Sequence, residues 1–258
     1  MIVRLLTMNI GNPSLERSKR QCEWLEKQNY DVLILTETKN SYGCQYISDY
    51  FFNIGNTIFS LETSKKYDVN FPISSTGDLG VMIISKYDIK NKHQAFNIQN
   101  RFYSRQSQVS IEINNKLLQI IGLYIPSRDR SVNKIQRKME FINSIKLEII
   151  NNSNCCSIIA GDFNILDKTH IPHYSTFFSW EYDFYDFLIE NKYVDVYRKL
   201  NPQKLDYSWF GRTGDGYRYD YIFVSSDIAS NILNCDFIHE SRLNKLTDHS
   251  ALFMEIDI

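Results

Sequence analysis

The chain has 258 residues, of which 43% are hydrophobic and 23% are charged, and its formal net charge at pH 7 is -1. This composition is that of an ordinary globular protein, and the length suffices to bury a large apolar core. The charge excludes the overall basic character of many nucleic-acid-binding proteins, although a local basic patch would still permit such binding.

The sequence predicts neither a targeting segment nor a membrane span. The first six residues, Met-Ile-Val-Arg-Leu-Leu, run straight into a strand-like pattern and are too short and interrupted for a signal peptide. The chain has no run of about 18 apolar residues that would indicate a transmembrane helix. Its five cysteines form no CxxC pair, and their odd number favours reduced thiols. We therefore expect a reduced, cytoplasmic protein.

Apolar strands that end at polar residues dominate the first half of the chain. Residues 2–10 form a strand pattern that ends at Asn9, and a helix follows that Ser14 can cap. A buried strand over residues 30–36 leads directly to Glu37. Further strands are predicted over residues 79–85, 108–113 and 117–124.

The second half alternates helices with shorter strands. A long helix is predicted over residues 133–151, with an apolar face formed by Ile135, Met139, Ile142, Ile145 and Ile149. A short strand over residues 157–160 stops at Gly161, and residues 180–191 form a helix pattern. Later strands are predicted near residues 193–197, 206–210, 219–225, 235–239 and 251–257. Many strands with few helices predict two packed sheets flanked by helices, in a single domain over residues 1–258.

The polar residues that suggest chemistry lie at strand ends. Those at or just after the end of a strand are Asn9, Glu37, Tyr124, Asp162 and Asn164, and those near the start of one are Asp220, Asp248 and His249. A rigid sheet holds such side chains while they face solvent and substrate. Hard carboxylate and amide oxygens hold a divalent cation, and a His–Asp pair manages protons or charge at a phosphate.

Each of these motifs also has a purely structural interpretation. Asn9 and the segment Gly161-Asp162-Phe163-Asn164 are ordinary turn sequences, and Glu37 can be a solvated strand end. In the functional interpretation, Asp162 binds or activates a nucleophilic water and Asn164 donates a hydrogen bond to a phosphate oxygen. Tyr124 belongs either to the core or to the site, where its hydroxyl would bond a phosphate oxygen.

The segment Arg218-Tyr219-Asp220-Tyr221 leaves a similar choice. Arg218 and Asp220 can form an ion pair at a sheet edge, or Asp220 can fix the tautomer of His249 and raise its basicity. His170 and His173 have a metal-like spacing, but the intervening Pro172 and the lack of a third clustered ligand favour a loop.

A basic stretch follows Tyr124. It consists of Arg128, Arg130, Lys134, Arg137 and Lys138. This stretch is either a solvated helix face or, if it lies beside the site, a surface that grips a polyanion.

Taken in order, these motifs resemble the endonuclease/exonuclease/phosphatase superfamily. The matching segments are Met8-Asn9-Ile10, Thr36-Glu37-Thr38-Lys39, Tyr124-Ile125-Pro126, Gly161-Asp162-Phe163-Asn164, Tyr207-Ser208-Trp209, Arg218-Tyr219-Asp220-Tyr221 and Thr247-Asp248-His249. Within the superfamily they look most like the exonuclease III/apurinic endonuclease branch.

The resemblance implies a four-layer α/β sandwich and a divalent-metal-dependent phosphodiester hydrolase, most simply a nuclease that acts on DNA. It implies that Glu37, assisted by Asn9 and Asp248, binds Mg²⁺ or Mn²⁺. The catalytic residues would be Asp162, Asn164, His249, Asp220 and Tyr124. The residues expected to contact substrate are Arg128, Arg130, Trp209 and Arg218.

Several positions depart from the branch. Gly11 stands where the branch often has Asp or Asn, Ser127 stands where an amide side chain is usual, and the loop over residues 210–217 is shorter. These departures put abasic-site specificity in doubt. The net charge of -1 and the glycine-rich loop over residues 210–217 leave open a phosphatase or phosphodiesterase of a small molecule or lipid headgroup as an alternative. A non-catalytic binding protein on the same fold is a second one.

Overall fold

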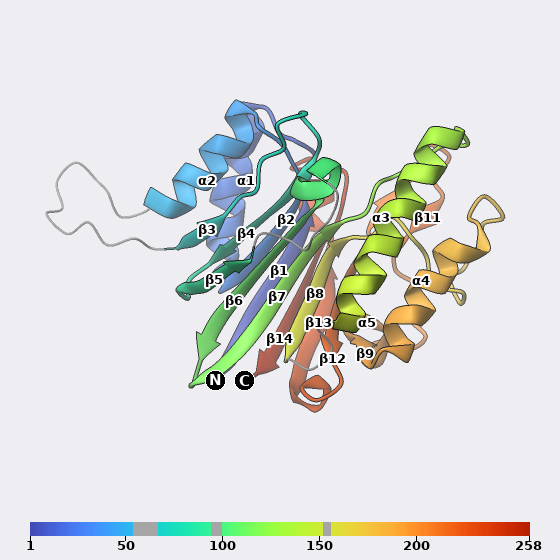
Figure 1. The fold of residues 1–258 in the computed structure, drawn as a ribbon. Helices are drawn as coiled ribbons and strands as arrows, with labels where there is room; N and C mark the ends of the chain where they lie inside the picture. Colours follow the sequence, from blue (N-terminus) through green and yellow to red (C-terminus); the bar gives the residue numbers. More distant parts are fainter. Residues whose placement is uncertain (54–66, 94–99, 152–155) are drawn as a thin grey trace, which may run out of the picture.

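The computed structural model describes residues 1–53, 67–93, 100–151 and 156–258. Within these ranges, two six-stranded sheets pack face to face and helices lie on both outer sides (Figure 1). This arrangement confirms the predicted four-layer α/β sandwich.

The first sheet contains both chain ends. Its strand order is β13 (Ile232–Ile238), β14 (Ala251–Asp257), β1 (Ile2–Asn9), β2 (Val32–Thr38), β4 (Gly80–Ser85) and β3 (Asp68–Asn70). β1 and β2 are parallel, whereas β14 and β4 run antiparallel to them. The helices α1 (Leu15–Gln28) and α2 (Tyr42–Asn53) cover the outer face. As predicted, the Ser14 hydroxyl caps α1 by accepting a hydrogen bond from the Arg17 backbone.

The second sheet carries the long central strands. Its order is β5 (Ile89–His93), β6 (Gln106–Ile113), β7 (Lys116–Tyr124), β8 (Ser157–Asp162), β12 (Asp220–Ser225) and β9 (Tyr193–Asp195). β7 and β8 are parallel, and β12 runs antiparallel to β8. Its outer face is covered by α3 (Val132–Asn151) and α4 (Ser179–Glu190). The smaller elements are β10 (Trp209–Phe210), β11 (Gly216–Tyr217), α5 (Val196–Leu200), α6 (Glu240–Leu243), and the 3-10 turns Asn100–Arg105 and Ala229–Asn231.

Side-chain alternation along the strands divides the apolar residues into three layers. The layer between the sheets includes Val3, Leu5, Ile34, Ile120, Ile158 and Ile222. The layer under α1 and α2 includes Leu6, Met8, Cys22, Leu25, Ile47 and Phe51. The layer under α3 and α4 includes Leu123, Phe141, Ile145, Ile159, Phe163 and Phe184. Both faces of the central strands are therefore buried, which explains why they appear as nearly continuous apolar runs.

The same alternation places four polar residues between the sheets. Asn9 continues the inner face of β1, and Tyr124 that of β7. Asp162 ends β8 and Asp220 begins β12, and both follow the inward positions of their strands. These residues gather at the end of the sandwich opposite the chain termini, which pair with each other through Met1 and Ile258.

β8 does not stop at Gly161 as the sequence predicted. The strand passes through Gly161 and ends at Asp162, which pairs with Tyr124 on β7. Gly161 has a φ of +143°, and a Cβ atom there would lie 2.0 Å from the Leu123 carbonyl oxygen. Only glycine keeps this close approach, and it allows the strand to continue to Asp162 in register.

Several element predictions were also wrong. α2 was not predicted, and residues 196–200 form a helix after a three-residue strand. Only Trp209 and Phe210 of the predicted strand 206–210 are paired, and Met139 is 36% exposed instead of facing the core. The inward face of α3 is formed by Lys138, Phe141, Ile142, Ile145 and Ile149.

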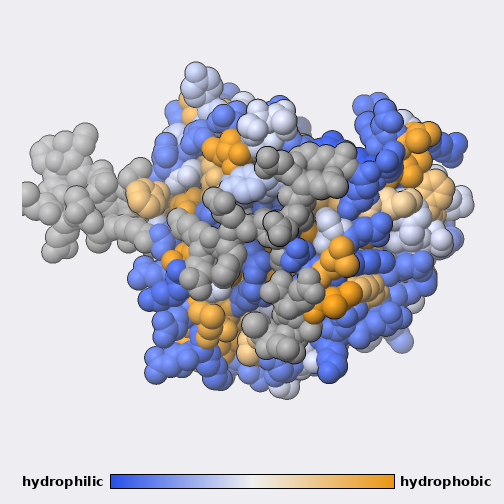
Figure 2. Space-filling view, in the orientation of Figure 1, coloured by the Kyte–Doolittle hydropathy of each residue, from blue (hydrophilic) through white to orange (hydrophobic). Residues whose placement is uncertain are grey.

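No helix in the described ranges is long and apolar enough to cross a membrane. Figure 2 shows a face on which hydrophilic residues predominate and hydrophobic ones form small separate groups. Cys22, Cys44, Cys156 and Cys235 are free thiols, and Cys155 lies outside the described residues.

Candidate active site

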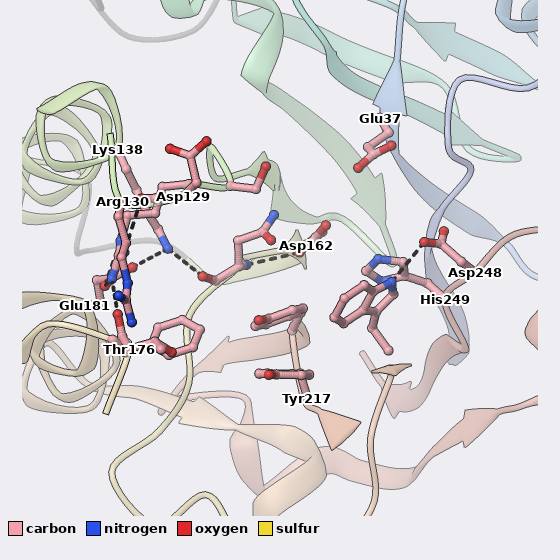
Figure 3. A pocket seen from close by; sticks show the side chains of 16 residues that line it. Glu37, Asp129, Arg130, Lys138, Asp162, Thr176, Glu181, Tyr217, Asp248 and His249 are labelled. Atoms are coloured by element: carbon pink, nitrogen blue, oxygen red, sulfur yellow. Dashed lines mark hydrogen bonds and ion pairs between the residues drawn. The ribbon is translucent and has the colours of Figure 1, made fainter. Parts of the chain in front are cut away.

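A pocket of about 480 Å³ opens at the end of the sandwich where the polar residues gather. The predicted site residues that line it are Glu37, Arg128, Arg130, Asp162, Asn164, Trp209, Asp248 and His249. Asn9, Tyr124 and Asp220 lie behind this lining and hydrogen-bond to its residues. Figure 3 shows Glu37, Asp248 and His249 on one side of the pocket, with Arg130, Lys138 and Glu181 on the other.

A buried hydrogen-bond network joins both sheets at the pocket floor. His249 donates from Nδ1 to Oδ2 of Asp220 at 2.7 Å, which leaves Nε2 directed away from that carboxylate. Asn9 donates from Nδ2 to Oδ2 of Asp162 at 2.9 Å and lies 3.4 Å from Nε2 of His249. The predicted pairing of Asp220 with His249 is therefore present.

Burial and neighbouring charges shift the pKa values of this network. Burial lowers the pKa of His249, but the Asp220 carboxylate opposes this effect and the pKa rises to about 10. Burial and the charge of Asp220 raise the pKa of Asp162 to about 8. The floor of the pocket thus holds two closely spaced carboxyl groups, those of Asp162 and Asp220. The imidazole of His249 offsets their negative charge.

Glu37 reaches the site through a bulge in β2. Thr36 continues the inner face of the strand, so regular alternation would turn Glu37 outward to the helices. The register instead shifts between Thr36 and Thr38, and Glu37 adopts a left-handed φ of 56°. Its Oε1 then accepts a hydrogen bond from the Tyr124 hydroxyl, at 3.0 Å, across the two sheets. The bulge re-aims this side chain, a common role for such irregularities.

Tyr124 is itself held from the other side. The Arg105 guanidinium lies 4.7 Å from the centre of the Tyr124 ring and also donates to its backbone carbonyl at 3.4 Å. Asp78 accepts from Arg105 at 2.8 and 2.9 Å. Tyr124 therefore contacts Glu37 with its hydroxyl while its ring belongs to the core, and its contact with a phosphate oxygen stays a prediction.

Asp248 is fixed by the hairpin of β10 and β11. Trp209 donates from Nε1 to Oδ2 of Asp248 at 2.9 Å and forms an isolated backbone bridge with His249. The Trp209 ring also lies 5.9 Å from that of Tyr219. The Asp248 carboxylate and the Trp209 indole therefore lie together at the pocket rim.

The donor set fits a hard divalent cation better than a soft one. Glu37 and Asp248 supply carboxylate oxygens at the pocket, and the described residues place no thiolate there. No group of three His, Cys, Asp or Glu residues that could hold a metal is found in the described part of the chain. Mg²⁺ binds through one or two carboxylates and keeps several waters, so Glu37 and Asp248 suit it, whereas the Asn9 amide donates to Asp162 and accepts from the Gly11 backbone. The raised pKa of Asp162 agrees with this, because a cation would relieve the crowded negative charge.

Asn164 is locked beside Asp162. It has a left-handed φ of 49°, its backbone N–H donates to Oδ1 of Asp162 at 3.0 Å, and its Nδ2 donates to the Ile125 carbonyl at 3.1 Å. The carboxamide has a second N–H, for which no partner is found among the described residues.

The basic stretch is mostly neutralised. Arg128 and Lys138 both pair with Glu181, Lys134 pairs with Asp129, and Arg137 pairs with Asp78. Arg130 is exposed at the pocket, and no ion pair to it is found among the described residues. Arg130 is therefore the residue of this stretch that best suits an external anion.

Arg218 was expected to bind substrate, and the structure contradicts that expectation. Its side chain is fully buried and donates to Asp195 and Asp167, each at 2.7 Å. Its guanidinium lies 4.4 Å from the centre of the Tyr221 ring, and the residue does not line the pocket. The backbone N–H of Arg218 donates to Nε2 of His170, which gives that histidine a structural partner.

Sequence reasoning named Lys138 only as part of the basic stretch and missed the pocket wall around it. The other residues of this wall are Thr176, Phe177, Glu181, Tyr217 and Tyr219. The available signal was Lys138, which shares the core-facing side of its helix with Ile142 and Ile145. A charged residue on an apolar helix face requires a buried partner.

The family and structural comparisons agree with the motifs. The model of the endonuclease/exonuclease/phosphatase family matches residues 6–249. An AP endonuclease from Archaeoglobus fulgidus superposes with a TM-score of 0.82 and 21% identity, covering 99% of this chain and 100% of that chain. A 3′ phosphatase from Neisseria, bound to a product DNA hairpin, gives a TM-score of 0.79 at 19% identity, with 99% and 100% covered. An AP endonuclease from Leishmania major gives 0.73 at 17% identity, with 100% and 88% covered. These likenesses establish the shared fold.

From the buried ion pairs of Arg218 we predict that the protein loses stability at acid pH, when Asp167 becomes protonated. Burial raises the pKa of Asp167, but Arg218 outweighs it and the folded-state pKa lies below the usual value. Its contribution to stability is thus complete above about pH 4, the unfolded-state value, and is lost as the pH falls through the folded-state pKa. Asp167→Asn should lower the free energy of unfolding by about 3–5 kcal/mol at pH 7, as expected when a buried pair loses one partner.

Urea unfolding at pH 7 and pH 3 measures this effect. The difference between wild type and Asp167→Asn should be constant above pH 5 and should narrow towards pH 3. Asp257→Asn is the matched control, because Asp257 pairs with the N-terminus in an exposed position. A difference that stayed the same at both pH values would contradict the assignment of this sensitivity to Asp167.

Proposed function

Because the chain belongs to the endonuclease/exonuclease/phosphatase family, we propose that it is a divalent-metal-dependent phosphodiester hydrolase that acts on DNA. One observation carries the proposal. The His249–Asp220 pair and Asp162 converge on the same pocket as the open carboxylates of Glu37 and Asp248. This combination of an acid–base network and hard oxygen ligands suits attack of water on a phosphodiester.

The residues divide the chemistry between them. Glu37 and Asp248, with Asn9 nearby, would hold Mg²⁺ or Mn²⁺, which neutralises the phosphate and the leaving oxygen. Asp162, oriented by Asn9 and Asn164, accepts a proton from the attacking water. His249, oriented by Asp220, places a positive Nε2–H beside the developing charge.

The similar solved structures and one residue, Arg130, support DNA as the substrate. The similar solved structures include AP endonucleases and a Neisseria protein bound to a product DNA hairpin. Arg130 supplies an exposed cation at the pocket, where a phosphate next to the cleaved one would lie.

A small-molecule or lipid-headgroup phosphate is the second candidate. The neutralised state of Arg128, Arg137 and Lys138 favours it, because these cations are not available to track a phosphate backbone. A non-catalytic binding protein is the least supported alternative, since the acid, base and ligand positions are all occupied by suitable residues.

Metal dependence is the direct test of the proposal. EDTA should abolish hydrolysis, and Mg²⁺ or Mn²⁺ should restore it, because Glu37 and Asp248 need a cation between them and the phosphate. Glu37→Gln should require more metal for half-maximal rate. The assay should cover duplex DNA, single-stranded DNA, abasic duplex, RNA and an inositol phosphate. Full activity of the metal-free protein would refute the proposal, and turnover of the inositol phosphate alone would favour the second candidate.

The proton-transfer residues give a second prediction. His249→Ala and Asp162→Asn should each lower the rate by roughly 10²–10⁴, the usual contribution of acid–base or electrostatic groups. Asp162→Asn should still fold, because it removes one of two buried carboxylates that face each other in register on β8 and β12. Asp129→Asn, at an exposed carboxylate of the same pocket, is the control and should retain its activity. Loss of the native fold in Asp162→Asn would show that Asp162 is structural.

Arg130 tests the substrate class. Arg130→Glu should reduce DNA cleavage and the salt dependence of DNA binding, since one phosphate contact is lost. It should spare a nitrophenyl phosphodiester, which is held only at the reacting phosphate. Lys134→Glu is the control, because Lys134 is exposed but already paired with Asp129. Unchanged cleavage of both substrates would show that Arg130 does not contact DNA.

A further inference from the structure

Lys138 is a charged residue enclosed in the wall of the pocket. Its side chain is only 1% exposed, although the residue lies on the helix face that otherwise packs apolar groups. Burial lowers the pKa of the amine to about 8. Enclosing such a charge is costly unless its partners are well placed.

The partners of Lys138 are both well defined. The ammonium group donates to Oε1 of Glu181 at 2.6 Å and to the backbone carbonyl of Asn164 at 2.6 Å. We propose that Lys138 is a positioning residue that holds Asn164, and through it Asp162, in the geometry that the hydrolytic reaction requires. This inference rests on the proposed function and adds a role for a residue that does not touch the substrate.

Asn164 needs such support because its backbone is left-handed. A non-glycine residue in this region is strained and persists only where its surroundings hold it. Its N–H is held by Asp162, its carboxamide by the Ile125 carbonyl, and its own carbonyl by Lys138. Without the ammonium group, the carbonyl would lose its partner and the residue one of its three anchors.

Glu181 anchors the ammonium group in turn. It is fully buried at the first turn of α4, where it accepts a hydrogen bond from the Phe178 backbone at 2.9 Å. It also pairs with Arg128, which donates to the Thr176 carbonyl at 2.7 Å. Three segments of the pocket wall, at Arg128, Asn164 and Thr176, are thereby tied to one carboxylate.

This arrangement also explains why Lys138 and Arg128 are poor phosphate ligands. Both cations share the charge of Glu181, and the Lys138 ammonium group is turned to Asn164. Their positive charge is used within the wall. Lys138 therefore acts on the reaction through Asn164, whereas Arg130 meets the substrate.

Lys138→Ala tests the inference. It should lower kcat about 10- to 100-fold, since a displacement of about 1 Å can cost this much. KM and the Mn²⁺ concentration for half-maximal rate should change less than about twofold, because the metal ligands are untouched. Lys134→Ala, one turn earlier on the same helix and exposed, is the matched control and should behave as wild type.

Chemical rescue of Lys138→Ala distinguishes a positioning role of the ammonium group from a packing role of the side chain. The cavity left by Lys138→Ala opens on the pocket, so n-propylamine can replace the missing atoms and should restore kcat about tenfold. The neutral isostere n-propanol should not. Equal rescue by both compounds, or an undiminished kcat without rescue, would overturn the inference. If Lys138→Ala does not fold, the double variant Lys138→Met, Glu181→Gln removes the donor to Asn164 together with the charge of its partner, and wild-type kcat in that folded variant would overturn the inference as well.

A crystal structure of Lys138→Ala distinguishes failure of the inference from failure of the proposed function. Asn164 should leave the left-handed region or release the Ile125 carbonyl, whatever the substrate is. An unmoved Asn164 overturns the positioning role. Lack of hydrolysis by the metal-loaded wild type, on every substrate of the panel, instead refutes the proposed function.

Discussion

The site depends on the register of β8 with its two neighbours. Asp162 pairs with Tyr124 of β7 and with Asp220 of β12, and all three positions continue inward-facing rows of their strands. A slip of one residue would turn each side chain to the helix-covered face. The absent Cβ of Gly161 permits the close approach that preserves this register one position before Asp162. The acid–base network is therefore set by strand pairing, and only its outer parts belong to loops.

Such a register has an electrostatic consequence. It brings two carboxylates together in a buried place, where the charge of Asp220 disfavours the charged form of Asp162. The imidazolium of His249 balances one of them through its bond to Asp220. Glu37 and Asp248 add further negative charge at the rim, so the divalent cation of the proposed function would complete the charge balance of the pocket. The same crowding of carboxylates would then favour binding of that cation.

Strand periodicity carried most of what could be predicted from the sequence. Asn9 and Asp162 were identifiable because each lies at the end of a strand. The pairing of Asp220 with His249 was one of two interpretations that the residue types left open, and the family resemblance implied it. Glu37 lies at a bulge, so alternation by itself would have assigned it to the wrong face. The stop predicted at Gly161 was wrong because glycine served close packing there, not a turn. Local sequence patterns predict well where strands end. They do not predict whether a glycine is required by a turn or by a close tertiary contact.

Charge pairing over long sequence separations limited the remaining assignments. Arg218 looked like a substrate ligand because its partners, Asp167 and Asp195, lie far from it in the chain. Arg128 and Lys138 looked like anion ligands for the same reason, and Glu181 neutralises both. A cation on an otherwise apolar helix face, as at Lys138, indicates a buried partner, whereas Arg130 follows a turn and stays exposed. Cations in buried ion pairs hold the pocket wall together, and only unpaired cations can bind phosphate. The number of basic residues near the site is therefore larger than the number of phosphate groups that they can contact.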